Sequence, residues 1–160
     1  GNVTVQVIAD NTTSTGKFNV DIEAAGFLSP YQTKYAGQAE FNLWPLDGYD
    51  EISLTSDVKL ITAEGEKMFT PEQLGSEVIK GEEISGGDSV EQAAKIFMNI
   101  LKGDGTASQN AVVVANAAMA LFITGKYGDY VSALEAAKES LFSKKALGVL
   151  NKLISMQIKK

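Results

Sequence analysis

The stretch "VKLITAEGEKMFTPEQLG", residues 58–75, predicts where the chain changes from strand to helix. Its first part holds two short apolar runs, "VKLIT" and "KMFT", joined by "AEGE", a pattern typical of a hairpin. In its second part, Thr70 can cap a helix and Pro71 suits the first helical position. Gln73 can close a capping box, and Gly75 can end the helix. We therefore expect a sheet before this stretch and helices after it.

The residues before this stretch alternate between apolar and polar side chains, which is the period of half-buried strands. "VTVQVIA" (3–9) and "KFNVDIEA" (17–24) lie on either side of a polar loop and predict a hairpin. "GQAEFNLW" (37–44) predicts a third strand, and "DEISL" (50–54) predicts a further one.

The residues after it carry the start signals of helices. The first three predicted helices follow the caps Asp88, Thr106 and Asp129, and Ser143 precedes the fourth. The first ends at Gly103, and the second, which contains Asn116, is expected to be the most buried. In the first and last helices, apolar residues recur at helical spacing and predict inward-facing stripes. These stripes are Val90, Ala93, Ala94, Phe97, Ile100 and Leu101, and then Leu147, Leu150, Leu153 and Ile154.

Strands followed by helices indicate an α/β to α+β fold. We expect a mixed β-sheet from N-terminal strands and hairpins, followed by a C-terminal set of at least four helices. The composition changes near Trp44–Pro45. We place a domain boundary there, between a strand-rich segment of residues 1–45 and a second region of residues 46–160.

Composition excludes several classes of function. The 160 residues are 44% apolar and carry a net charge of -6, which indicates a globular domain and argues against nucleic-acid binding. No apolar run reaches the roughly 20 residues that span a membrane. The chain has no cysteine, which fits a cytoplasmic protein. It also has no histidine, and all 14 basic residues are lysines, so histidine catalysis, histidine metal sites and arginine clamps are excluded within it.

Adjacent acids, Asp50 and Glu51, follow a bend at Gly48 and precede an apolar segment. Like charges repel, so the pair is either a solvated turn or a ligand pair for a shared cation. The residues alone leave both readings open.

Two further features have a structural and a functional reading. Gly86 and Gly87 precede a helix start and resemble a phosphate cradle, but the charge of Asp88 favours a structural cap. Asn116 lies in an apolar helix, where a buried amide bonded to neighbouring backbone is favoured over a ligand role.

From Leu46 onward, an ordered set of motifs resembles the C-terminal part of anthranilate phosphoribosyltransferases. The motifs are "DEISLT" (50–55), the hairpin with "TPEQLG", "GGDSVEQAAKIF", "NAVVVANAAMALFITGKY" and a closing pair of helices. The resemblance covers residues 46–158, and residues 1–45 do not match it.

The resemblance implies transfer of phosphoribose from phosphoribosyl diphosphate to anthranilate in tryptophan biosynthesis, a glycosyltransferase reaction. It implies that Asp50 and Glu51 bind Mg²⁺ against the departing diphosphate. The implied partners are phosphoribosyl diphosphate and anthranilate, with no nucleic acid and no membrane, and a homodimer is compatible with it.

The chain also departs from the family pattern. It lacks the Gly-Thr-Gly-Gly-Asp diphosphate loop, the Lys-His-Gly-Asn segment and the substrate arginine, and Asp21 and Ile22 stand where the family has a phosphate-binding Ser and Thr. We therefore assign no catalytic residue, leave open whether this chain is an enzyme, and expect no activity from it alone. The alternative is a non-catalytic binding or structural module that reuses the scaffold.

Overall fold

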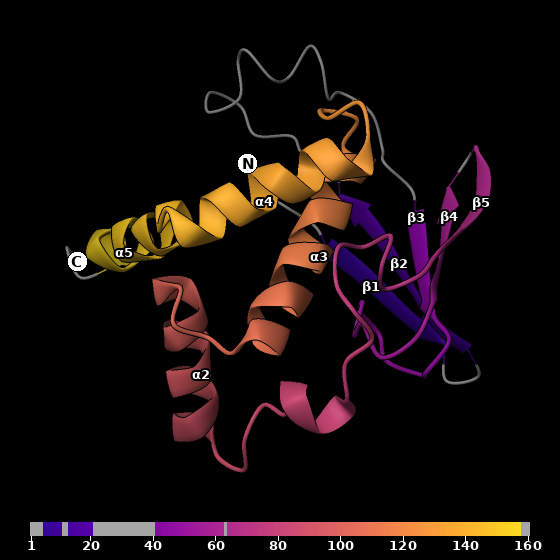
Figure 1. The fold of residues 1–160 in the computed structure, drawn as a ribbon. Helices are drawn as coiled ribbons and strands as arrows, with labels where there is room; N and C mark the ends of the chain where they lie inside the picture. Colours follow the sequence, from indigo (N-terminus) through magenta and orange to yellow (C-terminus); the bar gives the residue numbers. More distant parts are fainter. Residues whose placement is uncertain (1–4, 11–12, 21–40, 63, 158–160) are drawn as a thin grey trace.

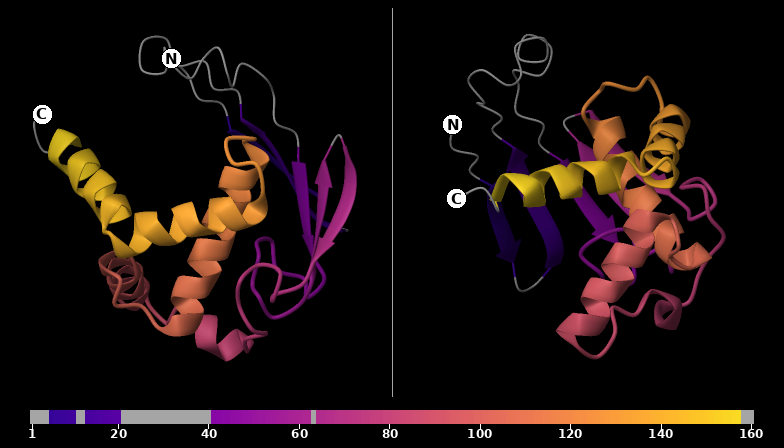
Figure 2. Two further views of the ribbon diagram at one scale, coloured as in Figure 1. Left: turned by 45° about the horizontal axis from the view of Figure 1, so that its top comes forward. Right: turned by 90° about the vertical axis from the view of Figure 1, so that its left-hand side faces the viewer.

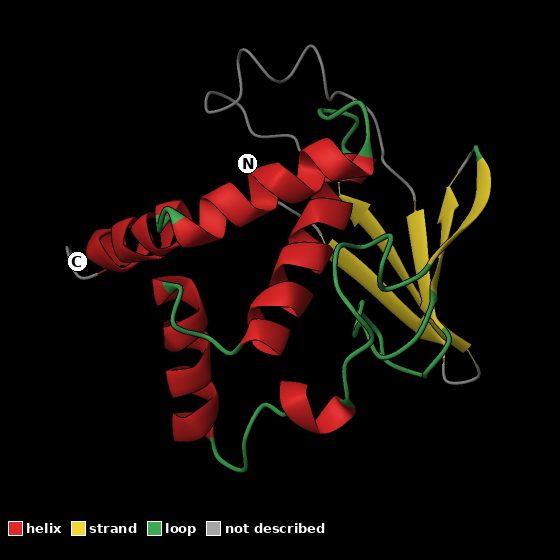
Figure 3. Ribbon diagram, in the orientation of Figure 1, coloured by secondary structure: helices red, strands yellow, loops and turns green. Residues whose placement is uncertain are grey.

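The computed structural model describes residues 5–10, 13–20, 41–62 and 64–157. A β-sheet lies on one side of the molecule and the helices lie on the other, with α3 next to the sheet (Figures 1 and 3). The described strands are β1 (Val5–Asp10), β2 (Thr13–Val20), β3 (Phe41–Pro45), β4 (Val58–Thr62) and β5 (Gly65–Phe69). The described helices are the short η1 (Gly81–Ile84), α2 (Val90–Lys102), α3 (Ala107–Ile123), α4 (Tyr130–Phe142) and α5 (Lys145–Gln157). This arrangement confirms the predicted fold class.

The described strands form one sheet in the order β1-β2-β3-β4-β5, and every described pair is antiparallel. The two predicted hairpins are confirmed as β1–β2 and β4–β5. The described pairing is antiparallel throughout rather than mixed, and a short connection explains this for the two hairpins, β1–β2 and β4–β5. The same sheet contains strands from both sides of the domain boundary proposed after residue 45, and that boundary stays a prediction.

The segment "DEISL" is not a strand, which corrects the prediction for residues 50–54. It lies in the loop between β3 and β4 and turns at Leu54, whose φ of 63° is unusual for a residue other than glycine. A left-handed residue takes the chain out of the extended conformation that a ladder requires.

Helix caps were mostly predicted correctly. Thr106 and Gln109 form a reciprocal capping box at the start of α3, and the Asp129 side chain accepts from the Ser132 backbone N–H at 2.7 Å at the start of α4. The cap of α2 is Ser89 rather than Asp88, because the Ser89 hydroxyl accepts from Gln92 N.

The "TPEQLG" stretch forms a single turn instead of a helix. The predicted reciprocal bonds are present, from Thr70 N to the Gln73 side chain at 2.9 Å and from Gln73 N to the Thr70 hydroxyl at 3.4 Å. Gly75, with a φ of 89°, ends the turn as predicted.

The core lies between the sheet, the β3–β4 loop, this turn and helices α3 and α4. Tyr130 is central: its ring packs against Phe69 and Phe122, with ring centroids 5.7 and 6.2 Å away. Helix α3 shares the buried position with α4, so it is not the single most buried helix. The buried apolar residues are Ile52, Leu54, Val58, Leu60, Phe69, Leu74, Val114, Ala115, Ala118, Met119, Tyr130, Ala133, Leu134, Ala137 and Leu141.

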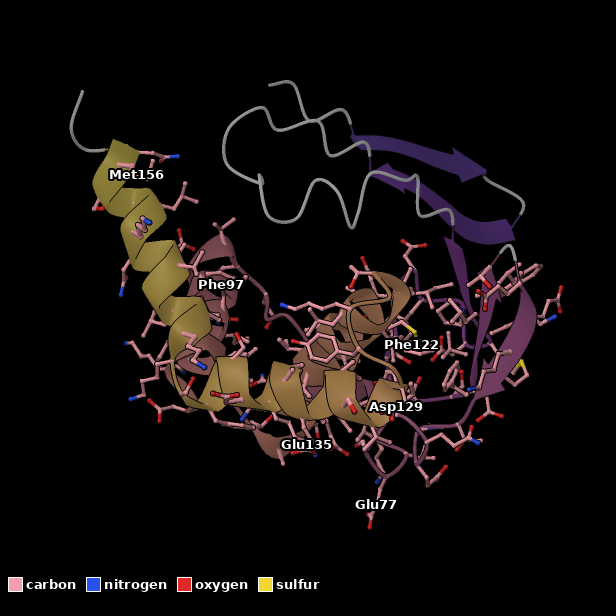
Figure 4. The ribbon with its side chains drawn as sticks, turned by 90° about the horizontal axis from the view of Figure 1, so that it is seen from above. Glu77, Phe97, Phe122, Asp129, Glu135 and Met156 are labelled. Atoms are coloured by element: carbon pink, nitrogen blue, oxygen red, sulfur yellow. The ribbon has the colours of Figure 1, made fainter. Side chains whose placement is uncertain are left out.

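Helices α2 and α5 bury their apolar stripes only in part: Ile100 and Leu101 pack against the core, whereas other stripe residues are exposed, which corrects the inward-facing prediction for those. Val90 is 81% exposed, Phe97 52% and Leu153 52%. Both helices contact α4 and each other, and α5 lies on the far side of the helices from the sheet (Figure 2). The labelled side chains of Phe97 and Met156 lie at this end of the molecule, away from Phe122 (Figure 4). Periodicity predicted the stripes but could not predict which of their residues the described chain leaves exposed.

Taken singly, none of the described helices has the length and apolar composition of a membrane span. Helices α2 and α3 meet those two criteria only as a pair, with a bend of 74° between them.

Candidate functional site

The acid pair lies in the loop of residues 46–57, which leaves β3 and returns to β4. Leu46 N donates to Asp57 O at 3.1 Å and closes the base of the loop. Asp50 and Glu51 are both exposed. Among the described residues, neither carboxylate accepts a hydrogen bond or forms an ion pair. Both carboxylates are therefore available to a ligand from solvent.

Asp47 ties the two sides of this loop together. Its carboxylate accepts from the Ser53 hydroxyl at 2.5 Å, from the Thr55 hydroxyl, and from the Tyr49 backbone N–H at 3.2 Å. Partial burial on its own would raise the pKa of Asp47, but these hydrogen bonds, led by that from Ser53, lower it below its usual value. Asp47 is thus held as a carboxylate whose acceptor sites are committed to the loop itself.

Asn116, in the middle of α3, holds the loop at Ile52. Its Oδ1 accepts from Ile52 N at 3.1 Å, and its Nδ2 donates to Ile52 O at 2.7 Å. The same Nδ2 donates to Val112 O in its own helix at 2.9 Å. One side-chain amide therefore satisfies both backbone groups of the residue directly after Glu51.

Two buried side chains that follow the acids anchor the loop in the core. Ile52 is 2% exposed and Leu54 0%, so both are part of the core. Leu54 O also accepts from Ile79 N at 3.1 Å. The loop therefore has a rigid buried side and a solvent side that carries the two acids.

The donor set of this loop suits a hard cation that keeps part of its coordination shell free. No group of three or more His, Cys, Asp or Glu that could hold a metal occurs within the described residues. Two adjacent carboxylates fit Mg²⁺, which is commonly bound by one or two carboxylates together with phosphate oxygens and water. The remaining ligands would come from a phosphate compound and from solvent.

A model of the glycosyl transferase family, a/b domain, matches residues 33–147 of the chain. The chain belongs to this family.

Three curated relatives, all named anthranilate phosphoribosyltransferase, are 40–47% identical to this chain over their aligned residues. Anthranilate phosphoribosyltransferase from Flavobacterium johnsoniae is 47% identical over 116 residues, which is 72% of this chain and 35% of the relative. The enzyme of the same name from Bacteroides thetaiotaomicron is 44% identical over 114 residues, 71% of this chain and 34% of the relative. That from Cytophaga hutchinsonii is 40% identical over 141 residues, 87% of this chain and 42% of the relative.

A solved structure shows the same fold. Anthranilate phosphoribosyltransferase from Thermus thermophilus superposes with a TM-score of 0.64 at 24% identity, over 72% of this chain and 34% of that chain. The chain thus spans about a third of the length of the first relatives. The family match begins at residue 33 and so takes in β3, which lies before the resemblance first noted from Leu46.

The structure does not support a phosphate-binding role for Gly86 and Gly87. Gly87 N donates to the Ser85 hydroxyl at 3.3 Å, and Asp88 N donates to the Gln92 side chain at 2.7 Å. The backbone N–H groups of Gly87 and Asp88 are therefore used within the chain, which favours a structural role, although the cap is Ser89 rather than Asp88.

Sequence reasoning found the acids but missed the residues that hold them. Asn116 was predicted to bond to neighbouring backbone, and its bond to Val112 O confirms this, but its bonds to Ile52 were not foreseen. Asp47 precedes Gly48, a pair that favours a turn in which Asp bonds two residues ahead, so its bond to Tyr49 N had a local signal. Asp21 and Ile22 lie outside the described residues.

Proposed function

We propose that this chain acts as the C-terminal part of an anthranilate phosphoribosyltransferase. The observation that carries this proposal is the 47% identity over 116 residues to a relative of that name. The substrates would be phosphoribosyl diphosphate and anthranilate, and the pathway would be tryptophan biosynthesis. The part of the site that binds the sugar and anthranilate would come from the portion of the relatives that this chain does not span. Like a biosynthetic enzyme of this kind, it would work in the cytoplasm.

In this proposal Asp50 and Glu51 hold Mg²⁺ next to the diphosphate. Both carboxylates are exposed and unpaired within the described residues, which leaves their oxygens open to a metal. When bound there, Mg²⁺ would stabilise the negative charge that grows on the diphosphate as it leaves the sugar. The role of this chain is to present two negative groups from a fixed loop, and no described lysine pairs with either acid.

A chimera tests the proposal. Residues 46–157 would replace the corresponding C-terminal segment of the Flavobacterium johnsoniae enzyme, and loss of anthranilate fluorescence would report turnover. We expect the chimera to be active, and the double variant Asp50→Asn, Glu51→Gln to lose at least about 100-fold in kcat/KM.

Glu77→Gln is the matched control, because Glu77 is an exposed acid that points away from the body of the molecule (Figure 4). It should leave kcat/KM unchanged. A chimera that folds but shows no turnover, or one that tolerates loss of both loop acids, would refute the proposed function.

A non-catalytic module is the second candidate. The observation that favours it is the absence of arginine and histidine from the whole chain, which removes two residue types suited to phosphate binding and proton transfer. The same chimera separates the two candidates, because a scaffold reused for another purpose has no reason to keep a working acid pair.

A further inference from the structure

We infer that Asn116 is a positioning residue for the acid pair. Its amide fixes the backbone at Ile52 and so sets the direction in which Asp50 and Glu51 project from the loop. This inference rests on the proposed function, because it concerns how the same Mg²⁺ and diphosphate site is held in shape.

The Asn116 amide is locked by three hydrogen bonds. Two join it to both backbone groups of Ile52, at 3.1 and 2.7 Å, and the third ties it to Val112 O at 2.9 Å. An asparagine amide has two N–H donors and one oxygen acceptor, and all of these groups are used here. A carboxylate has no donor and an aliphatic side chain has neither group, so neither could hold Ile52 in this way.

The position of these bonds gives them a role beyond stability. Ile52 directly follows Glu51, and Asp47 ties the loop from the other side of the acid pair through Ser53 and Thr55. Asp50 and Glu51 therefore lie between two fixed points. Site groups are held most precisely when rigid elements support them, and here the support is the middle of helix α3.

A fixed loop also favours ligand binding. Two neighbouring carboxylates repel each other, and a free loop would let them separate. A loop already held in shape loses less conformational freedom when the cation and diphosphate bind. Loss of the Asn116 bonds should therefore weaken binding even when the protein stays folded.

Asn110 provides the matched control. It is the same residue type in the same helix and is more buried than Asn116, and its Nδ2 donates to a loop backbone carbonyl, Gly105 O, at 3.0 Å. It has no hydrogen bond to the acid-bearing loop among the described residues. Asn110→Ala thus removes a hydrogen bond from an asparagine of α3 to a loop carbonyl without touching residues 46–57.

The test uses the whole chain and two measurements. Isothermal titration calorimetry measures Mg²⁺ binding in the presence of inorganic diphosphate, and NMR hydrogen exchange measures protection of the Ile52 amide without ligand. We expect Asn116→Ala to weaken Mg²⁺ binding about 10-fold, the low end of the loss that follows removal of an outer support of a metal site, because Asn116 acts through the backbone next to the acids. It should also abolish protection at Ile52. Asn110→Ala should leave both readings at the parent value.

Should Asn116→Ala fail to fold, Asn116→Gln carries the test. It keeps the amide but displaces it by one methylene, so all three bonds cannot form together, and the same weakening is expected. Parent-like affinity in whichever variant folds, or parent-like protection of Ile52, would overturn the positioning role alone. Absence of Mg²⁺ and diphosphate binding by the parent chain would overturn this inference as well, whereas the chimera alone decides the proposed function.

Discussion

Replacing Leu74 by Ala should destabilise the protein strongly, because this side chain anchors the turn of residues 70–76 in the core. Leu74 is 1% exposed. Its backbone O also accepts from the buried Tyr130 hydroxyl at 3.4 Å. The substitution removes three carbon groups, worth about 0.8 kcal/mol each, or about 2.4 kcal/mol in total. The cavity left behind adds to this.

The cavity at Leu74 has little room to collapse. A Cβ on the adjacent Gly75 would lie 2.5 Å from Leu134 Cδ2, so the turn already packs closely against α4. We therefore expect a total loss of about 3–5 kcal/mol in the free energy of unfolding, the upper part of the range for buried leucines.

Urea unfolding followed by circular dichroism measures this loss, with Leu46→Ala as control. Leu46 is 57% exposed, so the same change should cost under about 1 kcal/mol there. The midpoint for Leu74→Ala should shift without a change in slope, since the unfolded state is not altered. A loss under about 1.5 kcal/mol, or equal losses at the two leucines, would refute the packing argument.

Three further results are expected. Gly75→Ala should lower the free energy of unfolding more than Gly125→Ala does. Both glycines have positive φ, at 89° and 69°, but only a Cβ at Gly75 would meet a neighbour, Leu134. Urea unfolding compares the two variants, and equal losses would mean that backbone strain alone acts. Hydrogen bonds hold the pKa of Asp47 below 3.8, so its contribution to stability is present above that pH and is lost as pH falls through the lower folded value. The parent should therefore lose stability more steeply than Asp47→Asn between about pH 5 and 2 in thermal scans. Burial raises the pKa of Tyr130 above 10.0, so its contribution is present below pH 10 and is lost as pH rises further; Tyr130→Phe should show a flatter decline, and parallel curves would contradict this.

Features with local signals were predicted from the sequence. The caps Thr106 and Asp129 bond to backbone three residues away, and the β4–β5 hairpin joins strands through a short turn, so each signal lies within a few residues. The stripes of α2 and α5 were also read correctly as stripes. Whether such a stripe is covered depends on which element lies over it, and helical spacing carries no information about that.

The residues of the candidate site also fall into those with a local sequence signal and those without one. Asp50 and Glu51 were located from their motif, and the Asp47 turn had a local signal. The contact between Asn116 and Ile52 joins residues 64 positions apart, and no local pattern encodes such a pairing. The residues that bind a ligand can be read from a motif, whereas the residues that hold them in place are set by tertiary contacts.

The wrong strand at "DEISL" has a physical reason that also explains the site. Alternation of Ile52 and Leu54 with Ser53 predicted a half-buried strand, and the two apolar residues are indeed buried. Ser53 is buried as well, because its hydroxyl donates to Asp47 instead of to water, and Leu54 turns the chain with its positive φ. Alternation therefore reported burial correctly but not strand pairing, since the partner of Ile52 is a side-chain amide. The described residues just before Ile52 are not part of the sheet, and the two acids among them are exposed to solvent.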